Sequence, residues 1–193
     1  MYGAEGGDED AGSHAAMFLA VEEGRLEDLQ LLIADGADVK VEDCHGRTPL
    51  HFAVAMGHEA VTQMLLDAGA DVAAECSEVG MALNAAARGF RKDTTCHPCI
   101  SGRTPLHLAA MLSSEIVVHQ LLDAGADAAA EDTTGCIPLH LACQRGRESI
   151  AQILLDAFPG VTAKNNSGWT PLHFAAKKGL ETSAQVSPPE PET

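Results

Sequence analysis

Apolar residues recur along this chain at the spacing of one helix face, in short segments that end at glycine. In residues 115–122 the apolar positions are Ile116, Val117, Leu121 and Leu122, which fall on one face of a helix. Glycines that suit a left-handed helix end stand between such segments, at Gly57, Gly146 and Gly179. The pattern predicts pairs of short helices, each pair separated by a glycine turn.

One four-residue motif starts the first helix of each pair. The motif occurs as Thr48-Pro49-Leu50-His51, Thr104-Pro105-Leu106-His107, Ile137-Pro138-Leu139-His140 and Thr170-Pro171-Leu172-His173. A threonine hydroxyl can accept from the backbone N–H groups that open a helix, and proline presets φ and lacks a donor that would be unsatisfied there. The last three copies are 33 residues apart, and a fixed period of this length indicates a repeat architecture.

The chain resembles the ankyrin repeat family in its period and in this motif, which is followed by alanine. A hairpin signal of that family also recurs, as Gly36-Ala37-Asp38, Gly69-Ala70-Asp71 and Gly125-Ala126-Asp127. The resemblance implies an all-α solenoid of helix-turn-helix layers with β-hairpin-like loops. We expect about six repeats, the third lacking its second helix and the sixth incomplete.

The repeat period divides the chain into eight segments. They are a disordered acidic tail (1–13), an N-terminal capping repeat (14–46), a complete second repeat (47–79), a degenerate third repeat (80–101), two full repeats (102–134 and 135–167), a partial sixth repeat (168–182) and a proline-rich disordered tail (183–193).

The third repeat departs from the period. Met81 lies one period after Thr48, but only 23 residues separate Met81 from Thr104, so a second helix has no room. We therefore predict a kink or a loose seam at this layer. A spliced or misassembled reading frame would leave the same gap.

The C-terminal end has a related defect. Prolines at 188, 189 and 191 exclude a second helix of normal length from the sixth repeat. The apolar side of residues 150–155 should then be partly exposed, as a binding edge or as the mark of a truncated chain. A fragment of a larger adaptor or enzyme is one alternative that this end leaves open.

The amino-acid composition limits the classes of partner that this protein is expected to bind. The 193 residues include 12 Lys and Arg against 28 Asp and Glu, a net charge of −16, which should repel nucleic acids and anionic membranes. No run of eighteen apolar residues exists and the acidic start lacks signal-peptide features, so we expect an intracellular monomer, cytoplasmic or nuclear. The six scattered cysteines are expected to be reduced.

Catalytic patterns are missing from the sequence. No nucleophile elbow, glycine-rich phosphate loop or His-Glu-x-x-His pair occurs, so we expect neither enzymatic activity nor a cofactor. The resemblance implies that His51, His107, His140 and His173 form hydrogen bonds that tie one repeat to the next.

The sequence contains one local motif that could bind a metal ion or react as a thiol pair, Cys96-His97-Pro98-Cys99. Together with Cys76 it offers four ligands of the kind that zinc prefers. Because a second Cys-x-x-Cys is missing, we favour inert loop cysteines, and a metal-binding or redox-sensing module is the alternative.

Binding of a protein partner is the favoured function. The resemblance implies a concave surface built from hairpin tips and the outer positions of each first helix, so the protein should act as a non-catalytic scaffold or adaptor. Along the first helices these positions change from acidic through apolar to basic. The candidate contact residues are Met56, Arg88, Met111, Leu112, Gln144, Arg145, Lys177, Lys178, Arg47, Arg103 and Trp169. Met111 packed within its own layer and Trp169 covering the last repeat are the structural alternatives.

Overall fold

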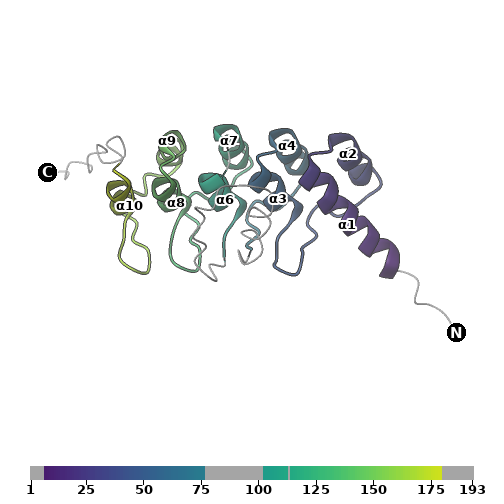
Figure 1. Ribbon diagram of the computed structural model, residues 1–193, viewed down its shortest axis with the longest axis horizontal. Coiled ribbons are helices and arrows are strands. Elements are labelled where there is room, and N and C mark those ends of the chain that lie inside the picture. Colours follow the sequence, from purple (N-terminus) through teal and green to yellow (C-terminus); the bar gives the residue numbers. More distant parts are fainter. Residues whose placement is uncertain (1–6, 77–101, 113, 180–193) are drawn as a thin grey trace.

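The computed structural model describes residues 7–76, 102–112 and 114–179. Over these ranges the regular secondary structure consists of helices (Figure 1). They are α1 (Gly7–Glu23), α2 (Leu26–Ala34), α3 (Pro49–Met56), α4 (Glu59–Asp67), α6 (Pro105–Leu112), α7 (Glu115–Asp123), α8 (Pro138–Arg145), α9 (Glu148–Ala157) and α10 (Pro171–Lys178). None of these helices is both long and apolar enough to cross a membrane.

The helices stand in two parallel rows (Figure 1). The inner row is α1, α3, α6, α8 and α10, and the outer row is α2, α4, α7 and α9. Each inner helix packs against the next inner helix, and each outer helix against the next outer helix, with the chain termini at opposite ends. This arrangement confirms the predicted all-α solenoid.

Each motif caps the inner helix that it opens. The backbone N–H of Thr48 donates to Nδ1 of His51 (3.1 Å), and the Thr48 hydroxyl lies 2.9 Å from the same nitrogen. Gly57, at a φ of 72°, ends α3 in the left-handed region that glycine tolerates. The inner helices are short because both signals act within one repeat.

Leucines at equivalent positions form one continuous core between the two rows. Leu50, Leu106 and Leu139 on the inner row and Leu65 and Leu121 on the outer row are almost fully buried. Burying a leucine side chain contributes about 1.5–3 kcal/mol, so each layer is stabilised mainly by its neighbours.

Among the described residues, the second and fourth repeats are direct neighbours. α3 packs directly against α6, and α4 packs directly against α7. The ring of His51 also reaches the carbonyl of Arg103 (3.3 Å), as a motif histidine reaches the next layer elsewhere. The second and fourth repeats therefore bury each other's apolar faces directly. The predicted degenerate repeat at residues 80–101 lies outside the described ranges and stays a prediction.

The extra residues enter the chain at the tip of a hairpin. In the regular hairpins one backbone hydrogen bond joins residues four positions apart, as from Asp132 to Cys136 (2.9 Å) and from Asn165 to Trp169 (2.9 Å). Cys76 and Arg103 make the same bond (2.9 Å) although they are 27 positions apart. The difference is 23 residues, so one regular repeat carries a long insertion between these two residues. Residues 77–101 themselves lie outside the described ranges.

The first helix begins earlier than predicted. Residues 1–13 were expected to be a disordered tail, yet α1 starts at Gly7. Alanine, the residue with the highest helix propensity, recurs within it at Ala15, Ala16 and Ala20. Local helix propensity thus extends the capping repeat toward the N-terminus.

The exposed edge expected at residues 150–155 is only partly present. Ile153 and Leu155 are half-buried, as predicted, but Ile150 and Leu154 are buried at 3% and 1% exposure. They are buried because α9 packs against both α7 and α8. The tail prediction for residues 183–193 lies outside the described ranges.

Candidate protein-binding surface

The last turns of the inner helices form a row of side chains across successive layers. We call this set the inner-helix row. Its described members are Glu22, Glu23, Met56, Leu112, Gln144, Arg145, Lys177 and Lys178. Because the inner helices stand side by side, the row runs from acidic through apolar to basic along the stack (Figure 1).

Leu112 is the apolar centre of this row. Its side chain is 40% exposed, whereas Met56 is half-buried. Met111 was predicted to share this centre but is only 4% exposed, and its sulfur lies 3.2 Å from Nη1 of Arg103. The contact prediction for Met111 is therefore wrong, because the residue packs within its own layer.

The basic end of the row is built around the single tryptophan. Trp169 is 37% exposed, and the Lys177 ammonium lies 5.4 Å from its ring centroid, within cation–π range. Lys178 is exposed and Arg145 is half-buried. Arg88, the remaining basic candidate, lies outside the described ranges.

Two arginines predicted to meet a partner are buried instead. Arg47 is 7% exposed, forms an ion pair with Asp43 and stacks 4.4 Å above the Phe52 ring centroid. Arg103 is 3% exposed, and its Nε lies 3.4 Å from Asp132 of the next hairpin. Both contact predictions are wrong, because these guanidinium groups hold hairpins together. The acidic residue four positions before Arg47 is the sequence signal that could have indicated this pairing.

The motif histidines connect one layer to the next. Nε2 of His107 lies 3.0 Å from the carbonyl oxygen of Cys136, and Nε2 of His140 lies 3.0 Å from that of Trp169. Because Nδ1 accepts from the backbone N–H at the helix start, each ring is neutral and donates through Nε2. Burial lowers the pKa of both histidines, more than the carbonyl acceptors raise it. Both ring nitrogens of these histidines are therefore engaged in contacts that start a helix and join two layers.

Sequence reasoning missed contacts between the outer helices. The hydroxyl of Ser114, which caps α7, donates to the carboxylate of Glu59 at the start of α4 (2.7 Å). The side-chain amide of Gln120 donates to the Glu59 carbonyl (3.2 Å). These bonds join the two layers that flank the insertion. No local sequence motif predicts them, because the bonded residues are 55 and 61 positions apart.

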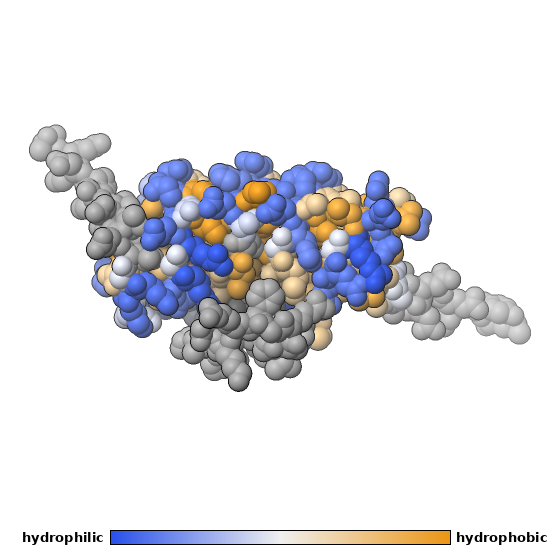
Figure 2. Space-filling view, turned by 45° about the horizontal axis from the view of Figure 1, so that its top comes forward, coloured by the Kyte–Doolittle hydropathy of each residue, from blue (hydrophilic) through white to orange (hydrophobic). Residues whose placement is uncertain are grey.

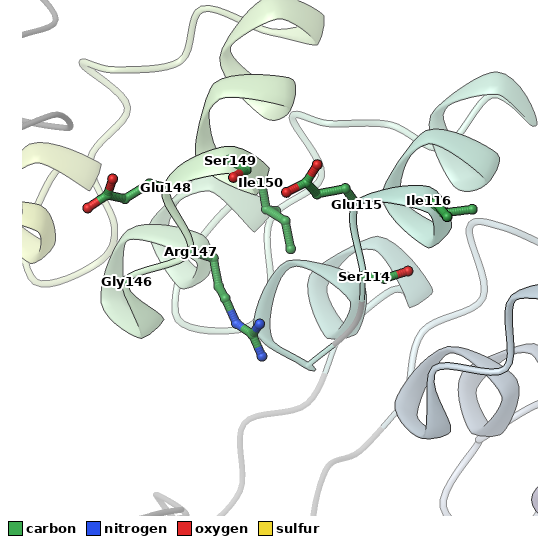
Figure 3. A pocket seen from close by; sticks show the side chains of 8 residues that line it. All are labelled: Ser114, Glu115, Ile116, Gly146, Arg147, Glu148, Ser149 and Ile150. Carbon is green, nitrogen blue, oxygen red and sulfur yellow. The ribbon is translucent and has the colours of Figure 1, made fainter.

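A shallow hollow of about 610 Å³ lies between the starts of α7 and α9. Figure 3 shows the Glu115 and Ile150 side chains close together, while Arg147 and Ile116 point in other directions. The Ser114 hydroxyl is already used in its bond to Glu59. The side chains that line the hollow point in different directions, whereas the groups of a catalytic site converge on one point (Figure 3).

The described ranges contain no group of three His, Cys, Asp or Glu side chains that could hold a metal ion. Cys76 is buried and its backbone pairs with Arg103. Burial raises the pKa of the Cys143 thiol to about 11, so this cysteine is a poor nucleophile. The zinc or redox prediction for Cys96, His97 and Cys99 lies outside the described ranges.

The face formed by the outer helices differs from the inner-helix row. Figure 2 shows apolar residues there interrupted by hydrophilic ones. Leu31 on α2 and Ile116 on α7 are its most exposed large apolar residues, at 65% and 53%, and they lie on helices separated by α4. This face supplies matched positions for control variants.

Comparisons with known proteins give one family. The family model for ankyrin repeats (3 copies) matches residues 2–76, 81–162 and 113–186. The chain is 33% identical over 126 residues, 65% of its length, to neurogenic locus notch homolog protein 1 of Xenopus laevis, and equally to that of Xenopus tropicalis. The corresponding protein of Danio rerio is 32% identical over 126 residues. The chain spans about 4% of the length of these relatives. Because the family model covers most of the chain, this protein belongs to the ankyrin repeat family.

Proposed function

We propose that the inner-helix row binds a protein partner and that the chain acts as a non-catalytic scaffold or adaptor. Ankyrin repeats are in general protein–protein interaction modules. The observation that supports the finer proposal is the exposed Leu112 at the centre of a row whose two ends carry opposite charge. The expectations of an intracellular monomer without nucleic-acid or membrane partners accompany this proposal.

Because the inner-helix row is long and its two ends carry opposite charge, it should bind an elongated partner in one orientation. An apolar side chain of the partner would pack on Leu112 and Met56, where burial supplies most of the affinity. Acidic side chains would lie toward Lys177 and Lys178, and basic ones toward Glu23. Reversing the partner would place like charges together, which costs affinity and slows association.

The first experiment compares charge-reversal variants on the two faces. A chain with Leu112→Ala, Arg145→Glu and Lys178→Glu should bind the captured partner at least about tenfold more weakly, since about 1.4 kcal/mol corresponds to a factor of ten. The controls are two pairs, each with one apolar and one basic change: Leu112→Ala with Lys178→Glu in the row, and Leu31→Ala with Lys40→Glu at exposed positions away from it. Circular dichroism checks that both chains keep their helices.

A second experiment locates the contact directly. A benzophenone amino acid replaces Leu112 in one chain and Leu31 in another, and irradiation links either chain to whatever lies beside it. Crosslinking of the partner at Leu112 but not at Leu31 supports the proposal. Equal affinity of all variants would refute the proposal. Crosslinking confined to Leu31 would also refute it and would place the partner on the outer helices.

A further inference from the structure

Two side-chain donors join the start of α4 to the next outer helix. The Ser114 hydroxyl donates to the Glu59 carboxylate (2.7 Å), and the Gln120 side-chain amide donates to the Glu59 carbonyl (3.2 Å). Glu59 is the first residue of α4, and Ser114 is the residue before α7. An acidic residue that opens one outer helix is thus bound by donors of the following layer.

The equivalent donors are missing one layer further along the stack. Glu115 opens α7 as Glu59 opens α4, and the residues one period after Ser114 and Gln120 are Arg147 and Ile153. Ile153 has no side-chain donor, and the Arg147 side chain points in another direction in Figure 3. Among the described residues, the Glu115 side chain takes part in no hydrogen bond or ion pair. Its carboxylate is therefore an acceptor without the donor that the repeat provides elsewhere.

The hollow of about 610 Å³ lies directly beside this carboxylate. Two isoleucines supply its apolar lining, Ile150 at 3% exposure and Ile116 at 53%. Figure 3 shows the Glu115 side chain close to Ile150. An apolar wall next to an unused carboxylate suits a long side chain that has an aliphatic stem and a cationic end.

We propose that this hollow binds an arginine side chain of a partner protein. The stem would pack on Ile150 and Ile116, and the guanidinium would donate two parallel hydrogen bonds to the Glu115 carboxylate, a geometry that lysine does not offer. Charge favours a basic occupant, because the hollow is lined by Glu115 and Glu148 against Arg147 and the chain carries a net charge of −16. An acidic side chain would meet two carboxylates there.

The hollow adjoins the inner-helix row in the sequence. Of the residues that line it, Ser114 follows Leu112 by two positions and Gly146 follows Arg145 by one. A partner seated on the row therefore reaches the hollow with a neighbouring side chain. Only the assignment of the arginine to that partner rests on the proposed function, since the binding of a guanidinium by the hollow does not depend on it.

The test uses Nα-acetyl-arginine amide as the probe and the full chain as the receptor. Isoleucine methyl groups are isotope-labelled for NMR, so that Ile116 and Ile150 report from the hollow and Ile33 on α2 reports from a distant helix. Two control probes have nearly the same length. The citrulline derivative lacks the charge, and the lysine derivative keeps the charge but lacks the planar fork.

We expect the methyl signals of Ile116 and Ile150 to shift and saturate with the arginine derivative, while that of Ile33 stays in place. Both control probes should bind at least about threefold more weakly, the range of an exposed ion pair. Glu115→Gln should remove most of the preference for arginine over citrulline. Glu27→Gln, an exposed carboxylate in the first turn of α2, is the matched control and should keep that preference.

Four results would overturn the proposal. Unchanged signals of Ile116 and Ile150 would show that the hollow binds no arginine. Equal affinity for the arginine and citrulline derivatives would leave only an apolar contact, and equal affinity for the lysine derivative would leave a site for any cation. An equal effect of Glu27→Gln would indicate general attraction to an acidic chain. Because the measurement contains no partner, none of these results bears on binding at the inner-helix row.

Discussion

Two equivalent glycines show at the residue scale how much of a turn is local and how much belongs to the neighbouring layer. Gly135 and Gly168 both have left-handed φ values, 73° and 79°. A Cβ at Gly135 would lie 2.7 Å from Oδ1 of Asn166, whereas one at Gly168 would meet no described residue within 4 Å. Gly168 is therefore needed only for its left-handed backbone. Gly135 is needed for its left-handed backbone and also because a side chain there would collide with the next hairpin.

Alanine substitutions at Gly135 and Gly168 separate the cost of a left-handed backbone from the cost of a collision with the next hairpin. Gly168→Ala should lower the free energy of unfolding by about 1 kcal/mol, the cost of a left-handed non-glycine residue. Gly135→Ala should cost about 1–2 kcal/mol more, because the neighbouring hairpin must also shift. Urea denaturation of both variants measures the difference, and equal costs would show that the adjacent hairpin yields freely.

The hairpin between α4 and α6 shows at the scale of elements how an insertion can be accommodated. Its base is closed by the bond from the Cys76 N–H to the Arg103 carbonyl, and the reverse bond measures 3.3 Å. The helices on either side of the hairpin pack directly against each other. The insertion is thus added to a complete repeat.

Removing the insertion should leave the stack folded. Deletion of residues 79–101 joins Ser77-Glu78 to Gly102 and restores a three-residue tip ending in glycine, as in the other hairpins. The free energy of unfolding should stay equal or rise by up to about 2 kcal/mol, because a shorter loop loses less entropy on closing. Urea denaturation followed by circular dichroism measures this change.

A deletion of the same length provides the control. Residues 115–137 also number 23 but contain α7 and the base of the next hairpin, so their removal should abolish cooperative unfolding. Comparable damage from the two deletions would mean that residues 79–101 form part of the core.

At the scale of the whole molecule, buried neutral histidines link successive layers. Burial lowers the pKa of His51 to about 4 and also lowers that of His107 and of His140. Protonation would place a hydrogen on the nitrogen that accepts from the helix start and a charge where water is excluded. Acid should therefore weaken helix starts and layer contacts together along the stack.

The stability of the chain should fall as the pH drops from 6.5 toward 4. In this window an unfolded histidine binds a proton that the folded chain excludes, so the free energy of unfolding decreases with decreasing pH. His51 alone should account for about 3 kcal/mol near pH 4. Urea denaturation at several pH values measures the slope.

Two histidine variants test whether the buried rings cause this dependence of the free energy of unfolding on pH. His51→Gln should make the dependence on pH shallower, because His107 and His140 remain. His119→Gln, at an exposed position on α7, is the control and should change the slope less. A native chain equally stable across this window would contradict the account of buried neutral rings.

For the candidate site, the sequence located surface positions better than buried ones. Leu112, Lys177 and Lys178 are exposed at the ends of inner helices, where the repeat pattern placed them. Arg47 and Arg103 were misjudged because they were expected at exposed hairpin tips, whereas each lies at the base of its hairpin and pairs with an aspartate, Asp43 or Asp132.

The sequence by itself determined the helix starts, the glycine ends and the period, because each of these signals acts within about ten residues of the chain. Only the tertiary structure decided which layers are neighbours. The contact between His51 and Arg103 joins residues 52 positions apart, across an insertion that the period alone could not place. Whether a stretch that departs from the period becomes a layer or a hairpin insertion depends on whether the flanking layers bury each other's apolar faces better without it.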